Sequence, residues 1–183
     1  HADHVMGLDD CRRFCSINGH RPLPLYADRQ TMKALRRVYQ YAFEGPLIRG
    51  YFKPEPQLIN GPFALGDLQV TPFEQSHGSM GSLGFLFEQV GAKCLAYYND
   101  CKAVSLHAVE AAKGVRVAVL DALRPHEHPS HMSLDEALTT ARRISAGETL
   151  LSHLTDFYDH DRDEAELPNG VRFAYDGLKL CLS

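Results

Sequence analysis

The chain opens with three metal-binding side-chain types within four residues, because His1, Asp3 and His4 lie in the sequence His-Ala-Asp-His. Imidazole nitrogens and a carboxylate oxygen are donors that a borderline-soft divalent ion such as zinc accepts. A segment with the charge order of a helix, acidic before basic, follows directly over residues 7–16. The opening of the chain therefore predicts a divalent-metal site that runs into a helix.

Three further candidate ligands each follow a predicted strand. His77 follows residues 68–74, Asp100 follows residues 94–98, and His153 follows residues 149–151. Taken singly, a histidine at the end of a strand is more often a surface or hydrogen-bonded residue than a ligand. Taken together and in this order, beside the opening motif, the three residues indicate one shared site.

The opening His-x-Asp-His resembles the end of the His-x-His-x-Asp-His signature of the metallo-β-lactamase superfamily. The later order of His, Asp and His, each after a strand, resembles the remaining motifs of that superfamily. On this resemblance His1 is the second histidine of the signature. We therefore expect the chain to be the C-terminal portion of a longer protein, with the first histidine of the signature upstream of it.

Four segments narrow the resemblance to the bacterial cyclic-phosphodiesterase branch, whose named member is phosphoribosyl 1,2-cyclic phosphate phosphodiesterase. They are residues 2–10, 120–124, 125–131 and 174–178. The resemblance implies an α/β fold, the αββα sandwich, with its N-terminal strands missing. It also implies two divalent ions, Zn²⁺ or Mn²⁺, and hydrolysis of a cyclic phosphodiester of a sugar phosphate by a hydroxide that bridges the metals.

The resemblance also implies a role for each candidate residue. The implied metal ligands are His1 and His77 at one ion, Asp3, His4 and His153 at the other, and Asp100 as the bridge. Asp3 is then also counted among the catalytic residues. His131 resembles the non-ligand histidine of the branch, which would protonate the leaving oxygen because its pKa lies near neutral pH. A histidine at the start of a helix, before the Ser133 cap, is the alternative interpretation.

Three residues are candidates for binding the substrate phosphate. His126 and His128 belong to a histidine-rich segment, and both contact with the phosphate and plain exposure to solvent stay open for them. Ser79 lies in the stretch 78–82, which offers backbone N–H groups and hydroxyls to a phosphate oxygen. A simple flexible turn is the alternative for that stretch.

Composition limits the classes of partner. The formal net charge of −4, from 19 basic and 23 acidic residues, gives no support for nucleic-acid binding, which needs a basic surface. Five cysteines without Cys-x-x-Cys spacing fit reduced thiols and a cytoplasmic location. No apolar run has the length of a membrane span.

We expect a small-molecule phosphodiester as the partner, with a homodimer left open. The alternative functions are a tRNA 3′-end processing nuclease and a non-catalytic, metal-poor binding module.

The elements that must position these residues follow from periodicity and turn signals. Helices are predicted over 7–16, from Asp28 onward, over 105–113 and from a capping box at Ser133 to residue 144. Strands are predicted over 22–26, 68–74, 83–89, 94–98, 115–120, 149–151, 171–175 and 178–182, with a long loop over 44–62. Two hairpins are predicted, one with its turn at Gly66-Asp67 and one around Gly91. No linker or repeat is visible, so residues 1–183 are predicted to belong to one domain, with strands in two packed sheets and helices outside.

Overall fold

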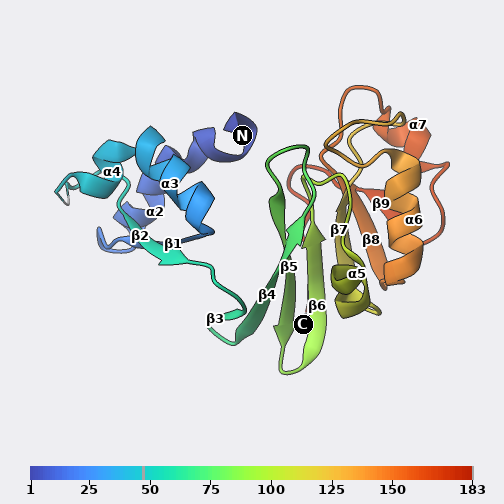
Figure 1. Cartoon of the computed structure of the whole chain (residues 1–183), viewed down its shortest axis with the longest axis horizontal. Helices are drawn as coiled ribbons and strands as arrows, with labels where there is room; N and C mark the ends of the chain where they lie inside the picture. The colour runs from blue at the N-terminus through green and yellow to red at the C-terminus, as the bar shows by residue number, and fades with distance from the viewer. Residues whose placement is uncertain (47, 183) are drawn as a thin grey trace. The chain divides into compact units, whose positions relative to one another are not determined.

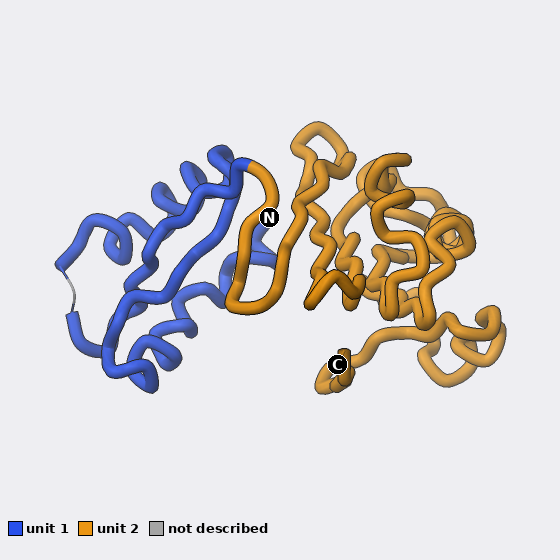
Figure 2. Tube along the Cα trace, turned by 90° about the horizontal axis from the view of Figure 1, so that it is seen from below, with its two compact units in different colours: residues 1–60 blue, residues 61–183 orange. Residues whose placement is uncertain are grey.

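The computed structural model describes residues 1–46 and 48–182. These residues form two compact units, His1–Asn60 and Gly61–Ser183, which Figure 2 colours separately. That residues 1–183 belong to one domain stays a prediction.

Unit 1, residues 1–60, packs short helices around a two-stranded parallel sheet (Figure 1). Its helices are α1 (Ala2–Val5), the 3₁₀ helix η1 (Met6–Cys11), α2 (Arg12–Ile17), α3 (Arg29–Val38) and α4 (Gln40–Glu44). Its strands are β1 (Leu23–Ala27) and β2 (Pro54–Leu58). The predicted helix 7–16 is thus a 3₁₀ turn followed by an α-helix. The predicted loop 44–62 contains β2, and it includes residue 47, which lies outside the described residues.

The longest helix of unit 1, α3, begins where the sequence predicts. The Asp28 side chain accepts the backbone N–H groups of Gln30 and Thr31 at 2.7 and 2.9 Å. These bonds satisfy two of the N–H groups that a helix start leaves without a partner. The buried face of α3 supplies Leu35 and, just beyond its end, Tyr39 to a small core with Cys15 of α2.

Unit 2, residues 61–183, is built on one seven-stranded sheet whose strands lie in sequence order (Figure 1). The strands are β3 (Phe63–Leu65), β4 (Leu68–Gln75), β5 (Ser82–Gln89), β6 (Ala92–Tyr98), β7 (Val117–Asp121), β8 (Glu148–Ser152) and β9 (Val171–Phe173). From β3 to β6 each strand pairs antiparallel with the next, and β3–β4 and β5–β6 are tight hairpins. From β6 to β9 each strand pairs parallel with the next. The two predicted hairpins are confirmed.

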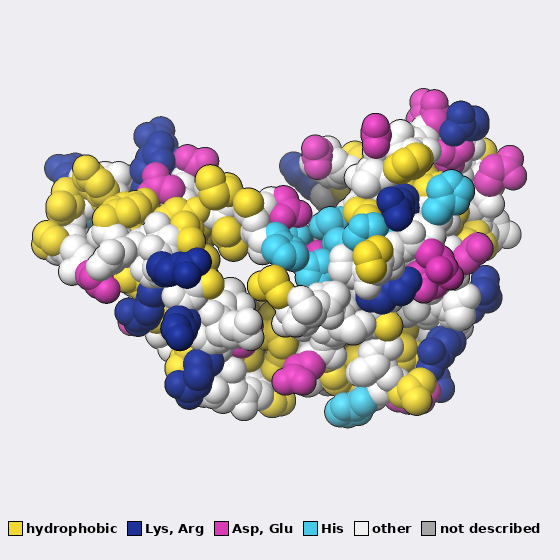
Figure 3. Space-filling model, turned by 45° about the horizontal axis from the view of Figure 1, so that its top comes forward, with side chains coloured by type: hydrophobic (Ala, Val, Ile, Leu, Met, Phe, Trp, Pro, Cys, Tyr) yellow, Lys and Arg dark blue, Asp and Glu magenta, His cyan; other side chains and the backbone are white. Residues whose placement is uncertain are grey.

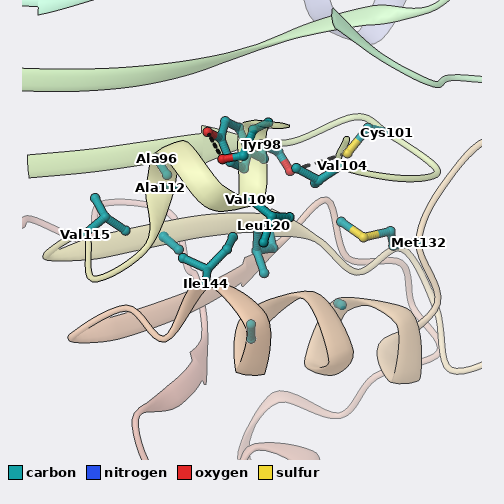
Figure 4. Close-up of a cluster of buried hydrophobic side chains, with 14 of the residues drawn as sticks. Ala96, Tyr98, Cys101, Val104, Val109, Ala112, Val115, Leu120, Met132 and Ile144 are labelled. Carbon is teal, nitrogen blue, oxygen red and sulfur yellow. Dashed lines mark hydrogen bonds between the residues drawn. The ribbon is translucent and has the colours of Figure 1, made fainter. Parts of the chain in front are cut away.

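Helices α5 (Leu106–Ala112) and α6 (Leu134–Ile144) cover one face of this sheet, and the short α7 (His160–Glu164) precedes β9. Figure 4 shows the buried side chains between the sheet and these helices, among them Leu120, Ile144 and Tyr98, whose hydroxyl donates to the Ala108 carbonyl at 3.0 Å. The predicted capping box of α6 is present at Ser133 and Glu136. No described helix has both the length and the hydrophobicity that a membrane span requires.

The other face of the sheet carries a second, smaller apolar cluster. Val117, Val119 and Leu150 form it, and leucines of the chain's last residues, Leu178, Leu180 and Leu182, pack against it. The strand predicted over 178–182 is wrong, because these residues form no strand in the structure. Their alternating leucines cover apolar strand residues without joining the sheet.

Candidate metal centre

The candidate ligands of unit 2 meet at one edge of the sheet. β4 is antiparallel to β5, and β5 is antiparallel to β6, so β4 runs in the same direction as β6, β7 and β8. His77 follows β4, Asp100 follows β6, Asp121 ends β7 and His153 follows β8. Carboxyl ends of strands that run in one direction share an edge, where open α/β sheets bind ligands. Figure 3 shows several histidine side chains gathered together on the face in view.

One carboxylate oxygen lies at the centre of this cluster. Oδ1 of Asp100 is 3.5 Å from Nε2 of His77, 3.7 Å from Nε2 of His153 and 3.7 Å from Nδ1 of His131. These distances exceed those of good hydrogen bonds. Donor atoms about 2.0–2.1 Å from a shared tetrahedral ion lie roughly 3.3–3.4 Å apart. The spacing of this set therefore fits side chains arranged around a small cation.

The rear nitrogen of His77 is held by the backbone. Nδ1 of His77 donates to the Ser130 carbonyl at 2.9 Å, and the side chain is only 4% exposed. This bond requires a proton on Nδ1, so in the neutral ring Nε2 is the nitrogen whose lone pair faces Asp100. Gly78 permits the approach, since a Cβ there would lie 3.3 Å from Cβ of Ser130. A metal-binding histidine commonly donates its second N–H to such an acceptor.

His131 is held in a different way, by a fully buried carboxylate. Nδ1 of His131 lies 2.7 Å from Oδ2 of Asp121, which is 0% exposed. The same carboxylate accepts the backbone N–H groups of Cys101 at 2.8 Å and Leu123 at 3.1 Å. Burial raises the pKa of Asp121 above that of an ordinary aspartate, while the Cys101 N–H and the charge of His153 lower it in part. From sequence, Asp121 at the end of its strand is a candidate for orienting an imidazole, but its partner His131 cannot be identified there.

Two residues of the cluster have left-handed backbone conformations. φ is 54° at Asp100 and 63° at His153, and neither residue is glycine. Such conformations cost free energy and concentrate at functional sites. The structure thus turns each side chain away from the course of its strand directly after the strand ends.

The donor set of unit 2 fits a divalent cation. Each of two groups of side chains places one donor atom per residue within 4.8 Å of the others: His77, Asp100 and His131, and Asp121, His131 and His153. His77, Asp100 and His153 are the ligands that the sequence predicts in this unit. His131 belongs to both groups, so geometry alone allows it to be a ligand as well as an acid.

The opening motif lies in unit 1. His1 is the N-cap of α1, and Asp3 and His4 lie within that helix, with Nε2 of His4 3.4 Å from Oδ2 of Asp3. All three side chains are exposed. Their assignment to the same metal site as the ligands of unit 2 rests on the sequence motif and stays a prediction.

The candidate phosphate-binding residues are neighbours of cluster residues in the sequence, but they make few contacts with the cluster itself. His128 Nδ1 lies 3.3 Å from both N and Oγ of Ser130, and its ring is 5.0 Å from that of His131. Burial, followed by repulsion from His131, lowers the pKa of His128. His126 and Ser79 are exposed. Their roles in binding substrate stay predictions.

One contact of the site was missed from sequence. The Ser130 carbonyl that holds His77 is a backbone group, which no side-chain pattern records. Leu86 of β5 is 2% exposed and belongs to the core under the helices, so this position contributes packing.

Comparison with known proteins settles the family. The family described as "Beta-lactamase superfamily domain" matches residues 1–154. The chain belongs to this superfamily. A crystal structure titled as a new diphosphatase from the PhnP family is 30% identical to the chain, with a TM-score of 0.84, and the match covers 100% of this chain and 70% of that one. The metallo-β-lactamase fold class is thereby confirmed, and so is the resemblance to the cyclic-phosphodiesterase branch, which is the PhnP family.

A more distant solved structure shares the fold, and one curated protein shares sequence with the chain over part of its length. The short form of human tRNase Z has a TM-score of 0.71 at 18% identity, over 100% of this chain and 76% of that one. A protein of Porphyromonas gingivalis named octanoyltransferase is 32% identical over 190 residues, which is all of this chain and 36% of that protein. The chain thus spans about a third of the length of this curated relative. Superfamily membership implies divalent-metal binding, which the His/Asp clusters of unit 2 support.

Proposed function

We propose that the chain belongs to a metal-dependent phosphodiesterase that hydrolyses a cyclic phosphodiester of a sugar phosphate, similar to phosphoribosyl 1,2-cyclic phosphate. The observation that carries the proposal is the His131–Asp121 pair beside the His77–Asp100–His153 cluster. It places a positioned imidazole next to donors that suit a divalent ion. The relationship to a PhnP-family diphosphatase supports chemistry at phosphorus.

The proposed cofactor is a pair of divalent ions, Zn²⁺ or Mn²⁺. His77 and His1 would contribute to one site, Asp3, His4 and His153 to the other, and Asp100 to both. When bound, such ions lower the pKa of water and neutralise charge that develops on phosphate oxygens. Because unit 2 holds His77 by a hydrogen bond to the Ser130 carbonyl and His131 by one to Asp121, it needs little rearrangement to accept a cation.

His131 would act as the general acid. Its Nδ1 is engaged by Asp121 at 2.7 Å, so Nε2 is the nitrogen that can deliver a proton to the departing sugar oxygen. The buried carboxylate stabilises the protonated ring and fixes its orientation, as an aspartate does in a catalytic triad. A sugar alkoxide is a poor leaving group without that proton, so hydrolysis of this substrate needs a general acid such as His131.

The test is the His131→Ala variant, assayed on phosphoribosyl 1,2-cyclic phosphate and on bis-(4-nitrophenyl) phosphate. Loss of an acid should reduce turnover of the cyclic substrate by roughly 10²–10⁴-fold with metal content unchanged. The loss should be smaller on the nitrophenyl ester, because nitrophenolate leaves without a proton. The exposed His107, which packs its ring on Phe73 at 5.3 Å, supplies the matched control His107→Ala.

Two results would contradict the assignment. If His131→Ala removes metal, the residue is a ligand; if both substrates lose activity equally, it is not the acid. His77→Ala and His153→Ala should instead lose metal and impair both substrates alike.

A second candidate is hydrolysis of a diphosphate at the same site, favoured by the diphosphatase relative. A phosphate leaving group needs no proton at neutral pH, so His131→Ala should hardly affect this reaction. A diphosphate substrate and the cyclic diester, assayed side by side on the wild-type protein, decide between the two. We also propose a small-molecule substrate rather than nucleic acid, which the net charge supports, and a cytoplasmic location, which the cysteine pattern supports.

A further inference from the structure

Residues 124–133 form a loop between β7 and α6 that is closed at its base by backbone hydrogen bonds. Leu123 N donates to the Met132 carbonyl at 3.0 Å, and Leu134 N donates to the Arg124 carbonyl at 3.1 Å. Arg124 and Ser133 are also bridge partners. The loop contains three of the histidines discussed above, His126, His128 and His131.

The guanidinium of Arg124 binds the backbone of its own loop. Nη2 donates to the Glu127 carbonyl at 2.7 Å, and Nε lies 3.4 Å from the His126 carbonyl. Two consecutive carbonyls therefore face one planar, rigid set of donors. Arginine suits this geometry because its fork is pre-organised, whereas a lysine ammonium is a single flexible point charge.

The far end of the same loop makes three contacts with the site. The Ser130 carbonyl accepts from Nδ1 of His77, His131 contacts Asp121, and Met132 N donates to the Cys101 carbonyl at 2.9 Å. The first contact fixes which nitrogen of His77 faces Asp100. The path of the loop from Arg124 to Ser130 therefore decides where that carbonyl lies.

We propose that Arg124 is a positioning residue for the metal centre: by holding the His126 and Glu127 carbonyls, it sets the loop that fixes the tautomer of His77. Its effect on catalysis rests on the proposed function, but its effect on metal binding does not. A guanidinium near a cation site is expected to weaken cation binding by repulsion. The positioning role predicts the opposite sign, so the two explanations can be separated.

The experiment titrates Zn²⁺ or Mn²⁺ into the wild type, Arg124→Ala, Arg124→Lys and Arg143→Ala. Arg143 is exposed in the last turn of α6 and is the control for loss of an arginine. We expect Arg124→Ala to bind metal about tenfold more weakly, the scale seen when groups that orient ligands are lost. Arg124→Lys should lie between it and the wild type, and Arg143→Ala should match the wild type. Added guanidinium ion should restore part of the affinity of Arg124→Ala.

Histidine ¹⁵N NMR spectra supply a second measurement that does not depend on activity. His77 should show a single Nδ1–H tautomer in the wild type and a mixture of tautomers in Arg124→Ala. Unchanged or tighter metal binding, together with an unchanged His77 tautomer, would overturn the proposal. A second result would also overturn it: Arg124→Ala loses metal only because the whole protein unfolds, and Arg124→Lys binds metal as tightly as the wild type. If the wild type hydrolyses no phosphoester at all, the proposed function fails, yet these two measurements still decide the role of Arg124.

Discussion

The two units hold the same kinds of metal-binding side chain in different ways. In unit 2, His77 is fixed from behind by a backbone carbonyl and His131 by a buried carboxylate. In unit 1, Asp3 and His4 lie on a four-residue helix that has no buried residue. A helix this short has little stability of its own. Donor chemistry is therefore shared by both units, but pre-organisation of the donors is a property of unit 2.

The cores of the two units explain this difference. Unit 2 buries a continuous apolar cluster between its sheet and helices, in which β7 is buried at every position. Among the described residues of unit 1, the core cluster contains only five buried residues: Cys15, Leu35, Tyr39, Ala42 and Phe52. A side chain at the end of a rigid strand keeps its position, and a side chain on a short exposed helix depends on what it binds.

The largest stability effect should follow from truncation in the core of unit 2. Leu151→Ala removes a side chain that is 0% exposed, which should lower the free energy of unfolding by about 2–5 kcal/mol. Leu35→Ala, at 6% exposure in the smaller core, should lie at or below the lower end of that range. Urea unfolding followed by circular dichroism measures both, with Leu151→Met as the control for shape. An equal or greater loss for Leu35→Ala would break the contrast between the cores.

The next prediction compares the stability lost when one aspartate from each unit is changed to asparagine. In Asp121→Asn, a side-chain amide replaces an oxygen that faces N–H donors, so one buried donor loses its acceptor. We expect destabilisation by about 1–3 kcal/mol. Asp3→Asn should leave stability almost unchanged, because the side chain is exposed. Thermal unfolding without added metal distinguishes them, and equal shifts would contradict the idea that only unit 2 is pre-organised.

A smaller effect is expected at the start of α3. Asp28→Ala removes the acceptor of two backbone N–H groups and should cost about 1 kcal/mol, whereas Asp28→Ser should restore most of it. Amide hydrogen exchange over residues 29–38 is the appropriate measurement. Unchanged protection of that segment in Asp28→Ala would show that packing alone holds the helix.

The smallest effect concerns the ion pair between Lys102 and Glu136, at 2.6 Å. Burial alone would raise the pKa of Glu136, but hydrogen bonds from Lys102 and Ser133 outweigh it and lower the pKa below its usual value. Stability from this pair is therefore present above the unfolded pKa of about 4.3 and is lost as pH falls through the lower, folded pKa. Both side chains are partly exposed, so Lys102→Met should cost under roughly 1 kcal/mol at neutral pH. The cost should shrink at acidic pH; a constant cost across pH would refute the linkage.

Local signals were sufficient for much of this fold. The Asp28 cap, the capping box at Ser133 and Glu136, and the hairpin turns at Gly66 and Gly91 each depend on a few adjacent residues, and each prediction is confirmed. The order of strand-end residues also predicted the cluster of His77, Asp100 and His153, since strand direction brings such ends together.

Other features depend on distant partners and could not be predicted in this way. β2 contains two prolines, which argue against a strand, but pairing with β1 at an edge accepts them. Leu178–Leu182 has the alternation of a strand, but its leucines are used to cover a sheet face. The bond from His77 to the Ser130 carbonyl joins residues 53 positions apart through a backbone atom, which no side-chain pattern records.

The left-handed backbone at Asp100 and His153 has a consequence for laboratory evolution. L-residues pay roughly 1–2 kcal/mol for this conformation, and glycine does not. A screen that selects only for heat resistance in metal-free medium should therefore enrich glycine at both positions. The recovered proteins would be more stable to heat but inactive, because the same substitutions remove the metal-binding side chains. Stability and activity would thus be selected in opposite directions at these two codons.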